Sequence, residues 1–98
     1  MDQADRVRFV VALVEALGKG AWVGKTHVQK TAYFAQEAAG IDLGLHFVIH
    51  HYGPYSFELD SLMQTLDSDG VLNITPDADG YGYVVSAGED AGEIEMIR

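Results

Sequence analysis

The 98-residue sequence predicts an α+β fold in which three helices are followed by a β-hairpin. Two observations predict it. Apolar residues recur at helical spacing in three separate segments, and two later segments rich in strand-forming residues flank a short turn. A hydrophobic content of 48% is that of a globular chain, and this length corresponds to a single domain, residues 1–98.

The first helix is expected between Asp5, as its N-terminal cap, and Gly18, as its end. Its apolar residues follow one another at spacings of three, four and three, which places them on one helical face. These residues are Val7, Val10, Val14 and Leu17. Because β-branched residues lower helix propensity, packing against that face must stabilise the helix.

The second helix is expected from about residue 26 to residue 39, with Thr26 as its cap and Gly40 after its end. Residues 45–52, by contrast, are rich in β-branched and aromatic side chains, and Gly53-Pro54 stops them. This composition predicts a short strand or a buried loop.

The third helix has the clearest pattern, with Ser56 as its expected cap and Gly70 as its expected end. Its apolar residues occupy positions i, i+3, i+4 and i+7 of one face. They are Leu59, Leu62, Met63 and Leu66.

Residues 71–75 and 81–86 are expected to pair as a β-hairpin, because residues 76–80 between them have strong turn chemistry. The last residues, 87–98, form an acidic tail. Three helices followed by a hairpin is the element order of a winged helix. In that arrangement the third helix usually reads DNA and the hairpin is the wing.

The charge balance argues against DNA binding. Six Lys and Arg stand against fifteen Asp and Glu, which gives a net charge of −9. A surface of this sign repels phosphate backbones and anionic lipid. The expected DNA-reading helix, residues 55–69, contains no Lys or Arg, and neither does the expected wing. Nucleic-acid binding by this chain alone and membrane binding are therefore not expected.

The absence of cysteine excludes disulfides, thiolate zinc sites and cysteine nucleophiles. No apolar run approaches the roughly 20 residues that span a bilayer. The N-terminal residues lack the basic and apolar regions of a signal peptide. The expected location is therefore the cytoplasm.

No catalytic motif stands out. The serines lack a Gly-x-Ser-x-Gly elbow, and Gly24-Lys25-Thr26 lacks the upstream glycine of a phosphate-binding loop. Three histidines in the extended segment are weak candidates for metal ligands, but no carboxylate accompanies them at a telling spacing. These histidines are His46, His50 and His51. We therefore expect no enzymatic activity, no metal and no cofactor.

Aromatic residues gather on the second helix and around Gly53-Pro54. They are Tyr33, Phe34, Tyr52, Tyr55 and Phe57. Two interpretations stay open. The first, which we favour, is a core packed around the turn. The second is a groove in which tyrosines anchor a partner.

This region resembles the Panacea domain family, which includes SocA-type antitoxins and YwgA-like proteins. The resemblance covers about residues 24–75. A Gln-Lys-x-x-Tyr-Phe piece at residues 29–34, the aromatic Phe47 and a Tyr-Gly-Pro-Tyr-Ser piece at residues 52–56 carry it. The sequence departs from the family at Thr31-Ala32, where a larger apolar pair is usual, and family members commonly continue with further helical sequence.

The resemblance implies a non-catalytic protein-interaction domain that binds and neutralises a partner toxin, and no catalytic residue carries over. A basic toxin would suit the acidic surface. The motif residues, which serve either the partner or the turn, are Gln29, Lys30, Tyr33, Phe34, Tyr52, Gly53, Pro54, Tyr55 and Ser56. The alternative is a winged-helix transcription regulator that binds DNA with positive charge supplied by a dimer or a further segment.

Overall fold

The computed structural model describes residues 2–18, 23–51, 53–76 and 82–91. They form an α+β fold of three helices and two separate two-stranded antiparallel sheets, so the predicted α+β class with three helices is confirmed. The helices are α1 (Gln3–Leu17), α2 (Lys25–Glu37) and α3 (Phe57–Ser68). The strands are β1 (Val48–His50), β2 (Gly53–Tyr55), β3 (Leu72–Pro76) and β4 (Tyr83–Ala87).

The element order differs from the predicted one, because a first hairpin, β1–β2, lies between α2 and α3. Gly53-Pro54 does not merely stop the extended segment, since it begins the returning strand. Gly53 has a φ of +115°, which favours glycine, and Pro54 pairs with Ile49. Proline fits here because a two-stranded ribbon has edge positions that need no N–H. The expectation of a single hairpin, placed after all three helices, is therefore wrong.

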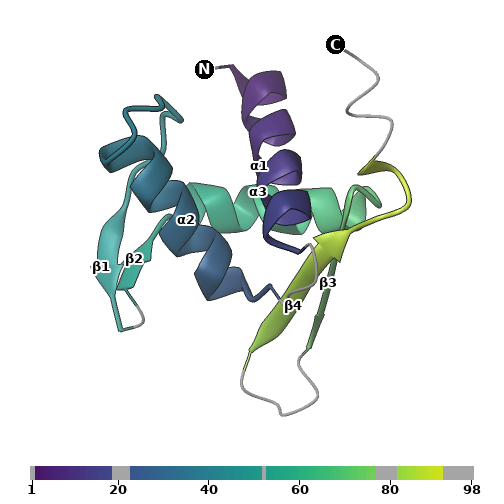
Figure 1. Cartoon of the computed structure of the whole chain (residues 1–98). Coiled ribbons are helices and arrows are strands. Elements are labelled where there is room, and N and C mark those ends of the chain that lie inside the picture. The colour runs from purple at the N-terminus through teal and green to yellow at the C-terminus, as the bar shows by residue number, and fades with distance from the viewer. Residues whose placement is uncertain (1, 19–22, 52, 77–81, 92–98) are drawn as a thin grey trace.

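Figure 1 shows the two hairpins on opposite sides of the helices. β2 packs beside α2, while β3 contacts α3 and β4 contacts α1. In this view α3 runs behind α1 and α2, from one hairpin toward the other. The N-terminal half of α2 thus points into the space between the two hairpins.

The core lies where the three helices meet the β3–β4 hairpin. Its helical members are Val10, Val11 and Val14 of α1, Val28 and Ala32 of α2, and Leu59, Leu62, Met63 and Leu66 of α3. The predicted stripe of α3 is therefore entirely buried. In the predicted stripe of α1, Val7 and Leu17 are only partly buried at its edges.

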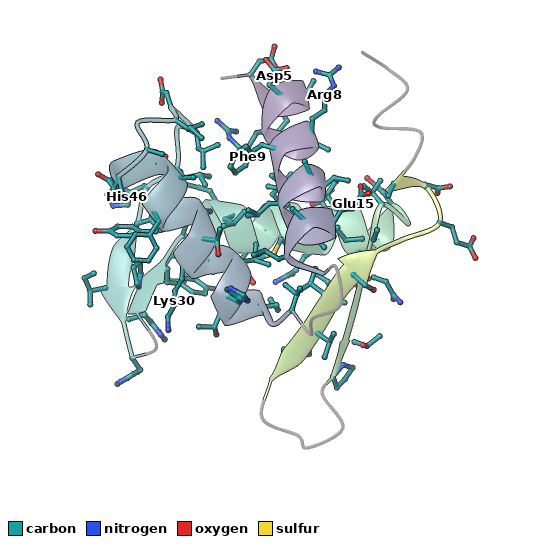
Figure 2. All side chains as sticks on the ribbon, in the orientation of Figure 1. Asp5, Arg8, Phe9, Glu15, Lys30 and His46 are labelled. Atoms are coloured by element: carbon teal, nitrogen blue, oxygen red, sulfur yellow. The ribbon has the colours of Figure 1, made fainter. Side chains whose placement is uncertain are left out.

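The sequence predicts Asp5 as the N-terminal cap of α1, but the cap is Asp2. The Asp2 carboxylate accepts the N–H of Asp5 at 2.8 Å. Asp5 itself lies in the first turn, where it pairs with Arg8 at 2.8 Å (Figure 2). A carboxylate one turn earlier satisfies the free amides at the helix start, which is why the helix begins sooner.

Both ends of α2 also differ from the prediction. The helix begins at Lys25, one residue before the predicted cap Thr26, and its N-cap is Gly24, which offers no side chain to the free amides. It ends at Glu37, and Gly40, with a φ of +72°, lies in the turn beyond.

The predicted cap of α3 is confirmed. Ser56 is 0% exposed and its hydroxyl accepts the N–H of Leu59 at 3.1 Å. At the other end, Gly70 has a φ of +78°, and its N–H reaches the carbonyl of Asp67 at 3.2 Å. The next N–H, that of Val71, reaches the carbonyl of Leu66 at 2.9 Å. This pair of bonds ends the helix and directs the chain into β3.

The β3–β4 hairpin forms as predicted, with Ile74 opposite Val85, whereas most of its connecting loop lies outside the described residues. Val23 adds a contact to this hairpin, because its carbonyl accepts the N–H of Val85 at 2.8 Å. Gly24 forms an isolated bridge with Val84. These bonds fix the start of α2 against β4.

The segment after β4 returns to the C-terminal end of α3. Gly88 donates to the carbonyl of Val71, and Asp90 donates to that of Gly70, each at 2.9 Å. Ala91 is 6% exposed. The first residues of the predicted acidic tail are therefore packed, and residues 92–98 lie outside the described part of the chain.

Candidate functional site

Two glutamines of α2 hold the segment that connects α2 to α3. Gln29, which is 2% exposed, donates to the carbonyl of Ser56 at 3.0 Å and accepts its N–H at 2.8 Å. Gln36 binds Leu45 in the same way, at 2.8 and 3.0 Å. Residues seven apart lie on the same side of a helix. Each amide therefore pairs with one backbone residue as a neighbouring strand would, and together they fix the hairpin to α2.

A pocket of about 490 Å³, which we call the α2 pocket, opens beside the N-terminal half of α2. α2 forms one wall, and the β1–β2 hairpin forms another. The start of β4 and one residue of α3 complete the lining. Its ionisable and aromatic side chains are Lys25, His27, Lys30, His50, Tyr55, Asp60 and Tyr83.

Two residues of the pocket lining, Lys25 and Asp60, form an ion pair. Lys25 Nζ lies 2.8 Å from Asp60 Oδ1, and the two side chains are 25% and 15% exposed. The same ammonium lies 5.0 Å from the ring centroid of Tyr83, within the range of a cation–π contact. The second carboxylate oxygen of Asp60 accepts a hydrogen bond from Gln64 at 2.7 Å. Lys25 and Asp60 therefore neutralise each other.

Tyr55 lies beside this ion pair. Burial raises the pKa of the Tyr55 phenol, and the Asp60 carboxylate raises it further through its charge and a hydrogen bond. The phenol therefore stays protonated at neutral pH and can donate a hydrogen bond. Its ring packs against Phe57 at 4.9 Å and against His50 at 5.5 Å between centroids.

Lys30 is the pocket cation without a carboxylate partner among the described residues. It is exposed, and Figure 2 shows it on α2 at the side of the β1–β2 hairpin. A β-carbon at Gly53 would lie 3.3 Å from Lys30 Cε. The stem of Lys30 therefore runs against Gly53, and Lys30 lines the pocket.

The β1–β2 hairpin also exposes large apolar side chains. Ile49 is 80% exposed, and Val48 is 37% exposed. On either side of the hairpin, Phe34 of α2 is 61% exposed and Phe57 of α3 is 64% exposed. Aromatic and branched side chains of α2, β1 and α3 are therefore exposed to solvent.

Ring contacts connect these exposed residues. Tyr33 meets Phe34 at 5.9 Å and Phe47 at 5.3 Å, both edge to face. Val48 pairs with Tyr55 across the hairpin. We call the exposed and half-buried apolar side chains of α2 and of residues 47–57 around the β1–β2 hairpin the hairpin surface, which consists of Tyr33, Phe34, Phe47, Val48, Ile49, Tyr55 and Phe57.

The structure divides the predicted motif residues among three places. Five of them line the α2 pocket, namely Gln29, Lys30, Gly53, Pro54 and Tyr55. Ser56 is buried as a helix cap, and Tyr33 and Phe34 belong to the hairpin surface. Tyr52 lies outside the described residues.

The favoured interpretation of the aromatic residues as core is wrong for Phe34 and Phe57, which are more than half exposed. The physical reason is the pair of glutamine contacts to Ser56 and Leu45. Gln29 and Gln36 attach the hairpin to α2 by hydrogen bonds. The rings of Phe34 and Phe57 therefore do not have to pack between the helix and the hairpin.

Sequence reasoning missed Lys25, Asp60 and Tyr83 as members of one site. They come from α2, α3 and β4, and no sequence spacing signals that they meet. Lys25 stands out in the sequence only as part of the Gly24-Lys25-Thr26 triplet, which is no phosphate-binding loop. The sequence signal that could have drawn attention to Lys25 is the small number of basic residues, six against fifteen acidic ones.

The three candidate metal ligands do not converge in the described residues. The rings of His50 and His51 meet edge to face at 5.3 Å, and the backbone N–H of His46 donates to Glu58 at 3.1 Å. Within the described ranges, no three His, Asp or Glu side chains lie together as a metal site. Among the described residues, no helix is long and apolar enough to cross a membrane.

No protein-family model matches the sequence, and no curated protein is similar enough to count as a match. The resemblance to the Panacea domain family therefore stays a prediction.

Proposed function

We propose that this chain is a non-catalytic protein-binding domain of the antitoxin type, which neutralises a partner toxin by binding it through the hairpin surface. The observation that carries the proposal is the clustering of exposed apolar side chains. Six large apolar residues are exposed in the described part of the chain, and four of them belong to this surface. Contiguous exposed apolar patches are typical of protein-interaction sites.

The chemistry of the hairpin surface suits a protein partner. Aromatic side chains bury a large area at low entropic cost and dominate the energetics of many interfaces. Among the described residues β1 pairs with β2 alone, so its outer edge presents backbone groups to which a partner strand can add. Hydrogen bonds along that edge and apolar contacts around it would act together.

The net charge favours a basic partner. At −9, the chain attracts positively charged proteins and speeds their encounter with it. Glu58 lies beside Phe57 at the start of α3 and is exposed, which places negative charge at the rim of the hairpin surface.

The winged-helix regulator is the weaker proposal. In that arrangement α3 would read DNA, yet α3 contains no Lys or Arg and carries Glu58, Asp60 and Asp67. The described strands β3 and β4 contain no basic residue either. Specific DNA binding depends on several contacts of Lys or Arg with phosphate.

The test begins with the full chain, tagged and purified from its native host, and mass spectrometry of what accompanies it. We expect one basic protein at near-equal stoichiometry. Calorimetry with that protein then compares the double variant I49S/F57S with the control I41S, because Ile41 is 36% exposed but lies outside the hairpin surface.

We expect the double variant to weaken binding by roughly a hundredfold, since each lost anchor is worth about 1–2 kcal/mol, and the control to bind normally. Growth of cells that express the partner should be restored by the wild-type chain and not by the double variant. Equal binding by all three chains would overturn the proposed surface. Co-purified DNA that survives moderate salt, without a protein partner, would favour the regulator.

A further inference from the structure

We propose that the α2 pocket binds a small phosphate ester whose organic part is a flat ring. This proposal does not rest on the protein partner, because the residues that carry it lie on α2, β2, α3 and β4 and, apart from Tyr55, outside the hairpin surface.

The charge of the pocket is opposite to that of the chain. The protein has only six Lys and Arg for fifteen acidic residues, yet Lys25 and Lys30 both line the pocket. Asp60 is the acidic residue of the described lining and is paired with Lys25 at 2.8 Å. Lys30 has no carboxylate partner in the described residues, so the described lining keeps one excess positive charge. An anion is therefore the ligand that this lining favours.

The backbone adds donors to the same wall. Gly24 gives no side-chain cap to α2, and the first turn contains no acidic residue. The first amide with an acceptor in the helix turn is that of Val28, which binds the carbonyl of Gly24 at 3.2 Å. The preceding residues, 25–27, all line the pocket, and their N–H groups have no partner within the helix. The amides of Thr26 and His27 and the side chain of Lys30 are therefore the donors that the terminal oxygens of a phosphate ester require.

The other walls favour a ring. Tyr55 and Tyr83 present aromatic side chains from opposite hairpins, and Pro54 adds an apolar surface. Tyr83 is 50% exposed although it is aromatic, which leaves its ring accessible. A volume of about 490 Å³ exceeds what inorganic phosphate needs and falls within the range of small-molecule sites, roughly 300–1,000 Å³.

Titrations of the ¹⁵N-labelled full chain, followed by amide NMR, test the proposal with four probes. Phenyl phosphate carries both features, whereas inorganic phosphate lacks the ring, benzyl alcohol lacks the charge and benzoate has a smaller anion. We expect phenyl phosphate to bind at least about tenfold more tightly than each of the other three, because each loses a group of contacts. The shifted amides should include Thr26 and His27.

Three variants separate the parts of the site. K30Q should weaken phenyl phosphate roughly tenfold, since a charge-assisted hydrogen bond is lost. The control R8Q removes the same charge from α1, outside the pocket lining, and should leave binding unchanged. Y83L keeps an apolar side chain but should erase the preference for phenyl phosphate over inorganic phosphate. All three positions are on the surface or half-buried, so these variants should fold.

The alternatives give distinct results. If benzyl alcohol binds as tightly as phenyl phosphate, the site recognises only the apolar ring. If benzoate binds as tightly as phenyl phosphate, the site does not select phosphate over carboxylate. Loss of affinity in R8Q equal to that in K30Q would show a general charge effect. Each of these results overturns the proposal and leaves the protein-binding function untouched, because that function is measured with a separate partner and separate variants.

Discussion

The Gln29 side chain pairs with the backbone of Ser56 in both directions, across 27 residues of sequence. Its amide donates to the Ser56 carbonyl at 3.0 Å and accepts the Ser56 N–H at 2.8 Å, and both residues are at least 98% buried. Ser56 also caps α3 through its hydroxyl. Ser56 thus links α2, the end of the β1–β2 hairpin and the start of α3.

The variant Q29L tests this link. Leucine has a similar volume, so packing changes little, but both hydrogen bonds are lost. The Ser56 N–H is then left buried without a partner, while the Ser56 carbonyl keeps the N–H of Asp60 at 3.1 Å. An unsatisfied buried group costs about 1–3 kcal/mol and the lost bond to the carbonyl about 1 kcal/mol, so we expect a loss of roughly 2–4 kcal/mol in the free energy of unfolding. Urea denaturation measures it.

Q36L is the matched control, because Gln36 makes the same pair of bonds to Leu45 in a half-buried setting. Water can replace those bonds, so the expected loss is about 1 kcal/mol. If the two variants lose equal stability, burial does not set the strength of the Gln29 contact.

Gly53 should resist substitution for two reasons. Its φ of +115° disfavours any side chain, and an added β-carbon would lie 3.3 Å from Lys30 Cε. We expect G53A to lower the free energy of unfolding by about 1–3 kcal/mol. G82A serves as control, since no described residue lies within 4 Å of its added β-carbon and its φ is not in the positive region. Thermal unfolding of both variants should separate them clearly, and similar melting temperatures would contradict the strain expected at Gly53.

Gly88 lies where two backbone segments meet. An added β-carbon would overlap the carbonyl oxygen of Gly70, which belongs to the backbone and cannot rotate away. The variant G88A must therefore break the bonds from Gly88 to Val71 and from Asp90 to Gly70. We expect a loss of roughly 2–4 kcal/mol, from two hydrogen bonds and the exposure of Ala91. Hydrogen exchange should show faster exchange at the amides of residue 88 and Asp90, and unchanged exchange there would refute the expected clash.

Sequence reasoning succeeded where a local rule decides the structure. The stripe of α3 and its Ser56 cap follow from spacing and capping chemistry, and both are present. It failed where contacts between residues distant in the sequence determine the structure. Gln29 belongs to a recognisable motif, yet nothing local shows that its amide replaces a strand partner for Ser56. The β1–β2 hairpin depends on that contact, which explains why the sequence predicts a single extended segment in its place.

The α2 pocket shows the same limit. Lys25 and Asp60 are 35 residues apart, and Tyr83 joins them from the other hairpin. Each is unremarkable alone, since acidic residues are abundant in this chain. Only the packing of α2 between the hairpins reveals that they share a site.

Tyr55 gives the stability of the protein a specific dependence on alkaline pH. Burial raises its pKa above the usual value of 10.0, and the charge of Asp60 and a hydrogen bond to it act in the same direction. Between the usual pKa and the raised one, the unfolded chain has lost the phenolic proton while the folded chain retains it. The unfolded state then binds fewer protons, so the free energy of unfolding falls as pH rises through this window.

The variant Y55F lacks this ionisation and should lose less stability than the wild type as pH rises from about 9 to about 11. All other side chains are the same in both proteins, so the difference between the two urea-denaturation curves isolates Tyr55. D60N should give an intermediate slope, because it removes the carboxylate but leaves the burial that is the largest cause. Parallel stability profiles for wild type and Y55F would show that burial and the Asp60 carboxylate do not raise the pKa of the phenol.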